Sequence, residues 1–212
     1  MATSFTHHFE PGTNPAAPPI LLLHGTGGDE LDLLPLGRAL SPGSALLSPR
    51  GNVNEHGAAR YFARVAEGVF DPAEITRRAH ELADFLAGSA REYGLDPARL
   101  IAVGLSNGAN IASAILLLRP IVFAGAVLFR PMVVLDTPAD PHSLDGKRVL
   151  VVGGARDPIV SVDHPHRVAS HLRAGGADIA LHMSPAGHGL IHEDIIVAQA
   201  WFSGATKLDR IA

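Results

Sequence analysis

The chain has 212 residues, of which 47% are hydrophobic and 18% are charged, so it can bury a sizeable core and carries too little charge for disorder. A formal net charge of −4 disfavours nucleic acid as a partner, and the absence of cysteine excludes disulfides, thiolate metal sites and a cysteine nucleophile. The N-terminus has no signal-peptide pattern, and no apolar run is long enough to span a bilayer. We therefore expect a single cytoplasmic domain over residues 1–212, without membrane insertion.

Short apolar runs alternate with helical patterns along the chain. We predict strands over residues 20–23, 45–47, 100–105, 124–129, 148–152 and 179–183, and helices near residues 31–40, 72–86, 109–118, 168–172 and 191–202. Residues 1–19 are expected to form an edge strand or arm and a proline-rich loop, and residues 52–70 a polar, irregular segment. Because the predicted strands are apolar on both faces, the pattern favours an α/β fold with a mainly parallel sheet and helices on each side.

The longest predicted helix has a well-defined start. Asp71 is expected to cap its N-terminus, and Pro72 to be its first residue. Glu74, three residues after the cap, is expected to complete a capping box.

Gly104-Leu-Ser-Asn-Gly108 lies between a predicted strand and a predicted helix. A serine between two glycines at such a junction is the pattern of a nucleophile elbow, in which a sharp turn exposes the serine hydroxyl. The pattern is weak alone, because a Gly-x-Ser-x-Gly sequence also arises by chance. Residues at the other strand ends must therefore provide the context.

Polar residues follow three strands of the predicted sheet. Ser106, Asp157 and His188 each come directly after a strand, where active sites of open α/β sheets form. A serine hydroxyl needs a base such as histidine, and the histidine needs a carboxylate to orient it. The order Ser, Asp, His is that of α/β-hydrolases. We therefore predict a catalytic triad of these residues.

A fourth strand end carries the glycine-rich turn His24-Gly-Thr-Gly-Gly28. Acyl transfer places negative charge on the former carbonyl oxygen, which two backbone N–H groups can stabilise. We expect these amides to be those of Asn107, directly after the nucleophile, and Thr26. His24 is expected to order the turn by hydrogen bonding and to take no part in catalysis.

The sequence resembles α/β-hydrolases of the small carboxylesterase/phospholipase group, which includes acyl-protein-thioesterase-like and dienelactone-hydrolase-related enzymes. The motifs that carry the resemblance are Leu22-Leu-His-Gly-Thr-Gly-Gly28, Gly104-Leu-Ser-Asn-Gly-Ala-Asn-Ile-Ala112, Asp157-Pro-Ile-Val160 and Gly187-His188. Ser48-Pro-Arg-Gly51 and Arg60-Tyr-Phe62 are similar to a bacterial branch of hydrolases linked to hydroquinone resistance. The resemblance implies a Ser/Asp/His triad, no metal or organic cofactor and often a homodimer. The predicted elements fit a small domain with no large lid.

Several residues compete with these assignments. Asp163 is the rival of Asp157, but it stands where a helix starts, and N-capping is the commoner role there. His182 falls within a strand and His192 on the last helix, so His188 is the better base.

Arg50, Arg60 and Phe62 either line a substrate cleft or merely hold their loop, and the sequence favours neither reading.

The function predicted from the sequence is that of a serine carboxylesterase. Its substrates would be small carboxylic esters, with thioesters and lysophospholipids as further classes. Two alternatives stay open: a non-catalytic protein of this fold that binds a small ligand, and a triad enzyme that performs acyl transfer or C–C bond hydrolysis.

Overall fold

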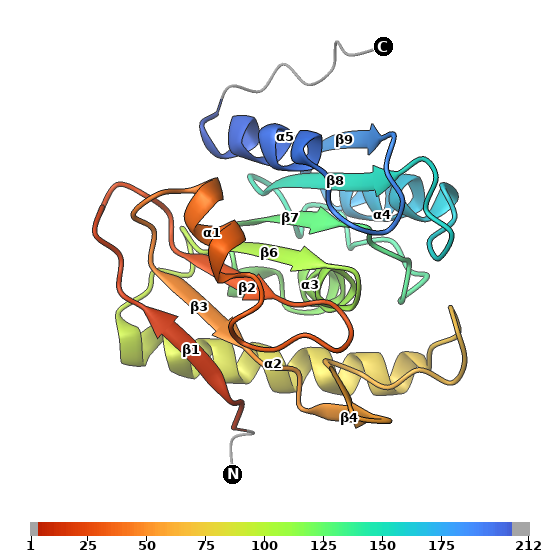
Figure 1. Cartoon of the computed structure of the whole chain (residues 1–212), viewed down its shortest axis with the longest axis horizontal. Coiled ribbons are helices and arrows are strands. Elements are labelled where there is room, and N and C mark those ends of the chain that lie inside the picture. Colours follow the sequence, from red (N-terminus) through yellow and green to blue (C-terminus); the bar gives the residue numbers. More distant parts are fainter. Residues whose placement is uncertain (1–3, 205–212) are drawn as a thin grey trace.

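A computed structural model of the chain describes residues 4–204. Within these residues the main sheet has seven strands in the order β1-β3-β2-β6-β7-β8-β9 (Figure 1). They are β1 His7–Glu10, β2 Ile20–Leu23, β3 Leu46–Pro49, β6 Ile101–Leu105, β7 Gly125–Phe129, β8 Arg148–Gly154 and β9 Asp178–Ser184. All neighbours pair in parallel except β1, which lies antiparallel to β3 at the edge. The predicted mainly parallel sheet is therefore confirmed, and the N-terminal arm contains an edge strand.

Helices cover both faces of this sheet (Figure 1). They are α1 Leu34–Leu40, α2 Pro72–Tyr93, α3 Asn107–Leu118, α4 Asp163–Ala174 and α5 His192–Phe202, and a short 3-10 turn at Pro120–Val122 follows α3. Within β2, Leu21 and Leu23 belong to the core under α2, α3 and α4, whereas Ile20 and Leu22 belong to the core under α1 and α5. Successive side chains of a strand point to opposite faces, so a continuous apolar run fits a sheet that is covered on both sides.

Residues 52–70 are irregular only in their second half, and the prediction is wrong for the first half. Val53–Glu55 (β4) and Ala58–Arg60 (β5) form an antiparallel hairpin. In its turn, His56 and Gly57 have φ values of 53° and 90°, which suit a two-residue hairpin of type I′. The prediction failed because the strands are only three residues long, and because histidine precedes the glycine where Asn or Asp is the usual signal.

The start of α2 is confirmed in its cap but not in its capping box. The Asp71 carboxylate accepts a hydrogen bond from the backbone amide two residues on at 2.9 Å, and Pro72 is the first helical residue. Glu74 instead pairs with Arg77 and Arg78 on the same helix. Ion pairs at this spacing lie on one face of a helix, so they compete with the capping box for the carboxylate.

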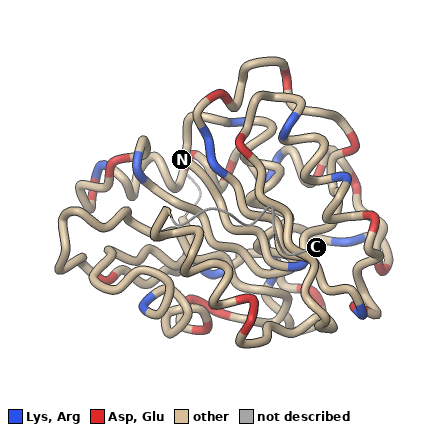
Figure 2. The backbone as a smooth tube through the Cα atoms, turned by 90° about the horizontal axis from the view of Figure 1, so that it is seen from above, with Lys and Arg blue, Asp and Glu red and all other residues tan. Residues whose placement is uncertain are grey.

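Charged residues of both signs are distributed over the described chain. Lys and Arg positions lie interspersed with Asp and Glu positions (Figure 2). Within residues 4–204, no helix has the length and apolar character needed to cross a bilayer.

The close approach of α3 to β2 requires glycine at position 108. A Cβ placed on Gly108 would lie 2.0 Å from the carbonyl oxygen of Leu23. A Cβ on Gly104 would lie 2.6 Å from the carbonyl group of Gly108. The turn between β6 and α3 therefore closes only because both residues lack a side chain.

We expect Gly108→Ala to prevent folding or to lower the melting temperature drastically, because the clash is with backbone that cannot rotate away. Gly88→Ala, inside α2, is the matched control. Nothing lies within 4 Å of a Cβ added there, so this change should stabilise the fold by about 0.4–1 kcal/mol. Thermal and urea unfolding followed by circular dichroism measure both variants. Similar stability of the two proteins would contradict the steric account.

Candidate active site

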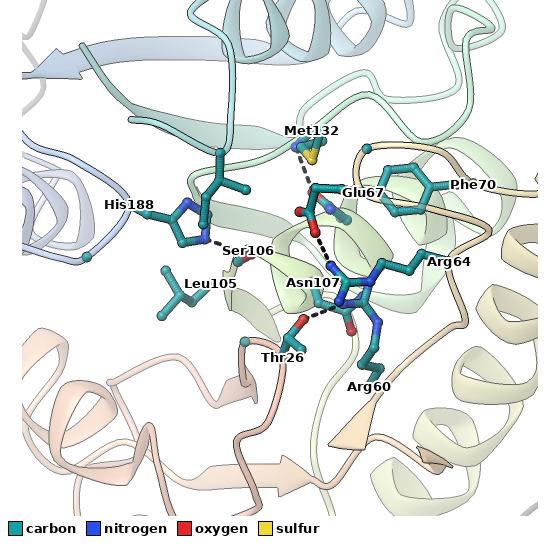
Figure 3. A pocket seen from close by; sticks show the side chains of 15 residues that line it. Thr26, Arg60, Arg64, Glu67, Phe70, Leu105, Ser106, Asn107, Met132 and His188 are labelled. Carbon is teal, nitrogen blue, oxygen red and sulfur yellow. Dashed lines mark hydrogen bonds and ion pairs between the residues drawn. The ribbon is translucent and has the colours of Figure 1, made fainter. Parts of the chain in front are cut away.

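A cavity of about 400 Å³ lies at the carboxyl ends of the central strands. Ser106 and His188 line it together with two kinds of side chain (Figure 3). The apolar ones are Phe70, Leu105, Met132 and Ile159, and the charged ones are Arg60, Arg64 and Glu67. The cavity thus combines an apolar wall, which can hold a carbon skeleton, with a charged wall.

Ser106 connects β6 to α3 in a strained backbone conformation. Its φ and ψ are 51° and −112°, values that residues other than glycine rarely adopt. The Ser106 amide donates to the Phe129 carbonyl at 2.8 Å, and the Ser106 carbonyl accepts from the Asn110 amide at 2.9 Å. The surrounding backbone therefore fixes this residue, as a nucleophile elbow requires.

His188 joins Ser106 to Asp157 through its two ring nitrogens. His188 Nε2 lies 3.0 Å from Ser106 Oγ, and His188 Nδ1 lies 2.8 Å from Asp157 Oδ2. The Asp157 side chain is fully buried, and its Oδ1 accepts from the amides of Ile159 and Val160 at 2.8 and 3.0 Å. Because an ionised carboxylate only accepts hydrogen bonds, Nδ1 carries the proton, and Nε2 is free to accept one from the serine.

The rival residues lie elsewhere. Asp163 is the exposed first residue of α4, and the expectation that it caps this helix is wrong, because Val162 holds the cap position. His182 lies on β9 and pairs with Glu193 at 2.9 Å, and His192 is the exposed first residue of α5. Among residues 4–204, no three His, Asp or Glu side chains gather in a way that could hold a metal ion.

Thr26 and Asn107 line the same cavity as Ser106. Asn107 Oδ1 accepts a hydrogen bond from the Tyr61 amide at 2.7 Å, and Thr26 Oγ1 accepts one from Arg60 Nη1 at 2.6 Å. The Gly27 amide donates to the Ala59 carbonyl at 2.9 Å. The hairpin and the residues directly after it therefore hold both backbone segments that were predicted to bind the oxyanion.

His24 is buried and orders the glycine-rich turn. Its Nε2 accepts a hydrogen bond from the Gly51 amide at 2.9 Å, so Nδ1 carries the proton and donates to the Gly25 carbonyl at 2.6 Å. Burial lowers the pKa of His24, although its hydrogen bond to Gly25 opposes this shift. The folded protein therefore favours neutral His24.

Arg50 and Phe62 do not line the cavity around Ser106. Arg50 forms a bidentate ion pair with Glu30, in which Nε and Nη2 donate to the two carboxylate oxygens at 2.5 and 2.8 Å. It lines a separate pocket of about 310 Å³. Phe62 is fully buried and packs edge-on against Phe70, with ring centroids 5.5 Å apart. Of the two alternatives left open for these residues, the structure excludes cleft lining for Arg50 and Phe62, because the unrecognised hairpin separates Arg50 from Arg60 and Phe62 lies in the core. Of the three predicted contacts, Arg60 does line the cavity.

Arg130, which the sequence reasoning missed, holds the loop that carries His188. Its buried guanidinium donates to the carbonyl oxygens of Gly187 and Gly189, at 3.0 and 3.1 Å. Its counter-ion is Asp194, which is equally buried and lies at 2.6 Å. The ion pair therefore fixes the backbone on both sides of His188. No spacing rule links an arginine after β7 to an aspartate in α5, so only the folded chain reveals the pair.

The comparisons with known proteins identify hydrolases as relatives of this chain. No family model matches the sequence. MhqD of Bacillus subtilis, which is named as a hydrolase, is 39% identical over 199 residues, which are 94% of this chain and 98% of MhqD. A carboxylesterase of Bacillus cereus is 39% identical and superposes with a TM-score of 0.91 over 95% of each chain.

The chain belongs to the carboxylesterase-like α/β-hydrolases. YahD, whose structure was solved with malic acid, is a further relative of this hydrolase. It is 30% identical and has a TM-score of 0.89 over 96% of this chain and 100% of YahD. The fold and the hydrolase group that the sequence predicted are confirmed by these relatives.

The pKa of His24 predicts a pH dependence of stability. Because burial depresses this pKa in the folded state, the unfolded chain binds more protons below pH ~6.5. The contribution of His24 is thus present above that pH and is lost as the pH falls toward the folded pKa. We expect the free energy of unfolding to fall less between pH 7.5 and 5 in His24→Gln than in the wild type. In urea titrations, His192→Gln is the exposed control, and a wild-type slope in His24→Gln would contradict the assignment.

The buried pair Arg130–Asp194 predicts an asymmetry between single and double variants. Arg130→Met leaves Asp194 buried without a counter-ion, so we expect a loss of about 3–5 kcal/mol. The double variant Arg130→Met/Asp194→Leu removes both charges and should recover part of that loss in urea unfolding. Arg77→Met, which breaks exposed pairs on α2, should cost less than about 1 kcal/mol. A double variant no more stable than Arg130→Met would refute this electrostatic explanation.

Proposed function

We propose that the protein is a serine carboxylesterase that hydrolyses small carboxylic esters. The observation that carries the proposal is the hydrogen-bonded series Ser106–His188–Asp157, with distances of 3.0 and 2.8 Å, at the wall of a cavity. The strained conformation of Ser106 and the relatedness to the Bacillus cereus carboxylesterase support it.

In the first half-reaction, Ser106 Oγ attacks the carbonyl carbon of the ester while His188 Nε2 takes the hydroxyl proton. Asp157 orients His188 and stabilises its imidazolium form. The amides of Thr26 and Asn107 would bind the oxyanion of the tetrahedral intermediate. When the C–O bond breaks, the alcohol leaves with the proton held by His188, and the acyl group stays on Ser106.

In the second half-reaction, water replaces the alcohol. His188 Nε2 takes a proton from the water, whose oxygen attacks the acyl carbon, and Ser106 Oγ leaves and regains the proton. The sum is one ester and one water converted to one carboxylic acid and one alcohol. The proposed chemistry needs no metal or organic cofactor.

The cavity supports small substrates. Its volume of about 400 Å³ is near the lower end of the range of about 300–1,000 Å³ for small-molecule sites. The presence of malic acid, a small carboxylic acid, in the structure of YahD agrees with this size. Short esters are therefore the first substrates to test, with thioesters and lysophospholipids beside them.

Fluorophosphonate labelling followed by intact-mass spectrometry tests the nucleophile. We expect the wild type to be labelled once and Ser106→Ala not at all, with ester hydrolysis reduced by at least about 10⁴-fold. Ser203→Ala, at the end of α5, is the control and should be labelled like the wild type. Labelling of Ser106→Ala would refute the proposal. A labelled wild type that hydrolyses no ester or thioester would instead favour acyl transfer or C–C hydrolysis.

A further inference from the structure

Arg60 is a buried cation in the wall of the candidate active site. The residue is only 4% exposed, yet it lines the cavity beside Thr26 and Asn107 (Figure 3). Its Nη1 donates to Thr26 Oγ1 at 2.6 Å, and its Nε donates to the Phe62 carbonyl at 3.1 Å. Its Nη2 forms no hydrogen bond with the part of the chain that the structure describes. Two N–H donors of Nη2 are thus available to a ligand.

The negative charge around Arg60 is shared with a second arginine. Glu55 lies 3.3 Å from Arg60 Nε, and the same carboxylate binds Arg64 Nε more closely, at 2.5 Å. Glu67 also pairs with Arg64, but its side chain is 68% exposed at the rim. Two guanidinium groups therefore share one largely buried carboxylate. Burial of Arg60 is the main cause of its lowered pKa, which agrees with a cation that is incompletely stabilised.

We infer that Arg60 binds a carboxylate on the substrate, so that the enzyme prefers esters that carry a negative charge to neutral esters of the same size. The inference rests on the proposed esterase function and names its substrate class. A carboxylate in the cavity would supply the missing counter-charge and accept charge-assisted hydrogen bonds from Arg60. The apolar wall formed by Phe70, Met132 and Ile159 would hold the carbon chain between the charge and the scissile bond.

Glu67 gives the inference a second, opposite consequence. Its carboxylate also lines the cavity and lies on Arg64, so it competes with an anionic substrate for the same cationic wall. Removing its charge should therefore increase the preference for anionic esters, whereas removing the charge of Arg60 should decrease it.

Two matched pairs of esters measure the preference. On the acyl side, monoethyl succinate is compared with ethyl 4-methylpentanoate, and on the alcohol side, 3-(butanoyloxy)propanoate is compared with 3-methylbutyl butanoate. Hydrolysis is followed in a pH-stat, and the measured quantity is the ratio of kcat/KM for the anionic and the neutral member. We expect a ratio of about tenfold or more for the wild type on one of the two sides. The pair that shows it identifies the part of the substrate that faces Arg60.

The variants separate recognition from a purely structural role. Arg60→Met should reduce the ratio at least tenfold, Glu67→Gln should raise it, and Arg50→Met, whose arginine lines the other pocket, should leave it unchanged. Because Glu67 is exposed, Glu67→Gln tests the inference even if Arg60→Met fails to fold.

Three results would overturn the inference. The first is a wild-type ratio near one for both pairs, and the second is an equal loss on both members of each pair in Arg60→Met, which would mean that Arg60 only supports the Thr26 turn. The third is a lower ratio in Glu67→Gln. If one of these results is obtained and fluorophosphonate labelling is retained, the inference about Arg60 fails while the proposed esterase function stands. Absence of labelling in the wild type refutes both.

Discussion

The contact between the first turn of α3 and the end of β2 is the constraint on which the rest of the site depends. β2 and β6 are parallel neighbours, and Leu23 pairs in register with Gly104, so their carboxyl ends lie side by side. Only glycine at position 108 lets α3 approach the Leu23 carbonyl group. This approach brings the backbone at Asn107 next to the glycine-rich turn after β2. The positions of the proposed nucleophile and of both proposed oxyanion amides thus follow from one steric condition.

Buried charge positions the remaining members of the site. The Arg130–Asp194 pair holds the two peptide groups around His188, and Asp157 accepts two backbone amides besides His188. A buried ion pair adds little net stability, since the cost of desolvation offsets much of the attraction. Its contribution here is geometric, because the loop between β9 and α5 has no sheet partner at His188 to fix the ring opposite Ser106.

The sequence predicted those parts that depend on local patterns. The sheet strands, the elbow glycines and the three polar strand ends could be found because parallel strands place their carboxyl ends at one edge of the sheet. The hairpin β4–β5 was missed because three-residue strands give no periodic signal. Because the hairpin was missed, the sequence could not show that Arg50, Arg60 and Phe62 have different surroundings. They lie in a separate pocket, in the cavity wall and in the core, respectively. Arg130 was missed because its partners lie more than fifty residues away.

The segment that local patterns could not predict also forms part of the cavity wall. The hairpin and the residues directly after it hold Asn107 and the turn after β2, and the same segment supplies the charged wall formed by Arg60, Arg64 and Glu67. Arg60 also donates to the Thr26 side chain, so in the proposed enzyme one guanidinium contacts both the substrate and the turn that binds the oxyanion. An anion that engages Arg60 would act on this turn as well as on binding. The reaction class can therefore be read from strand ends and glycines, whereas the substrate class depends on long-range ion pairs that only the folded chain brings together.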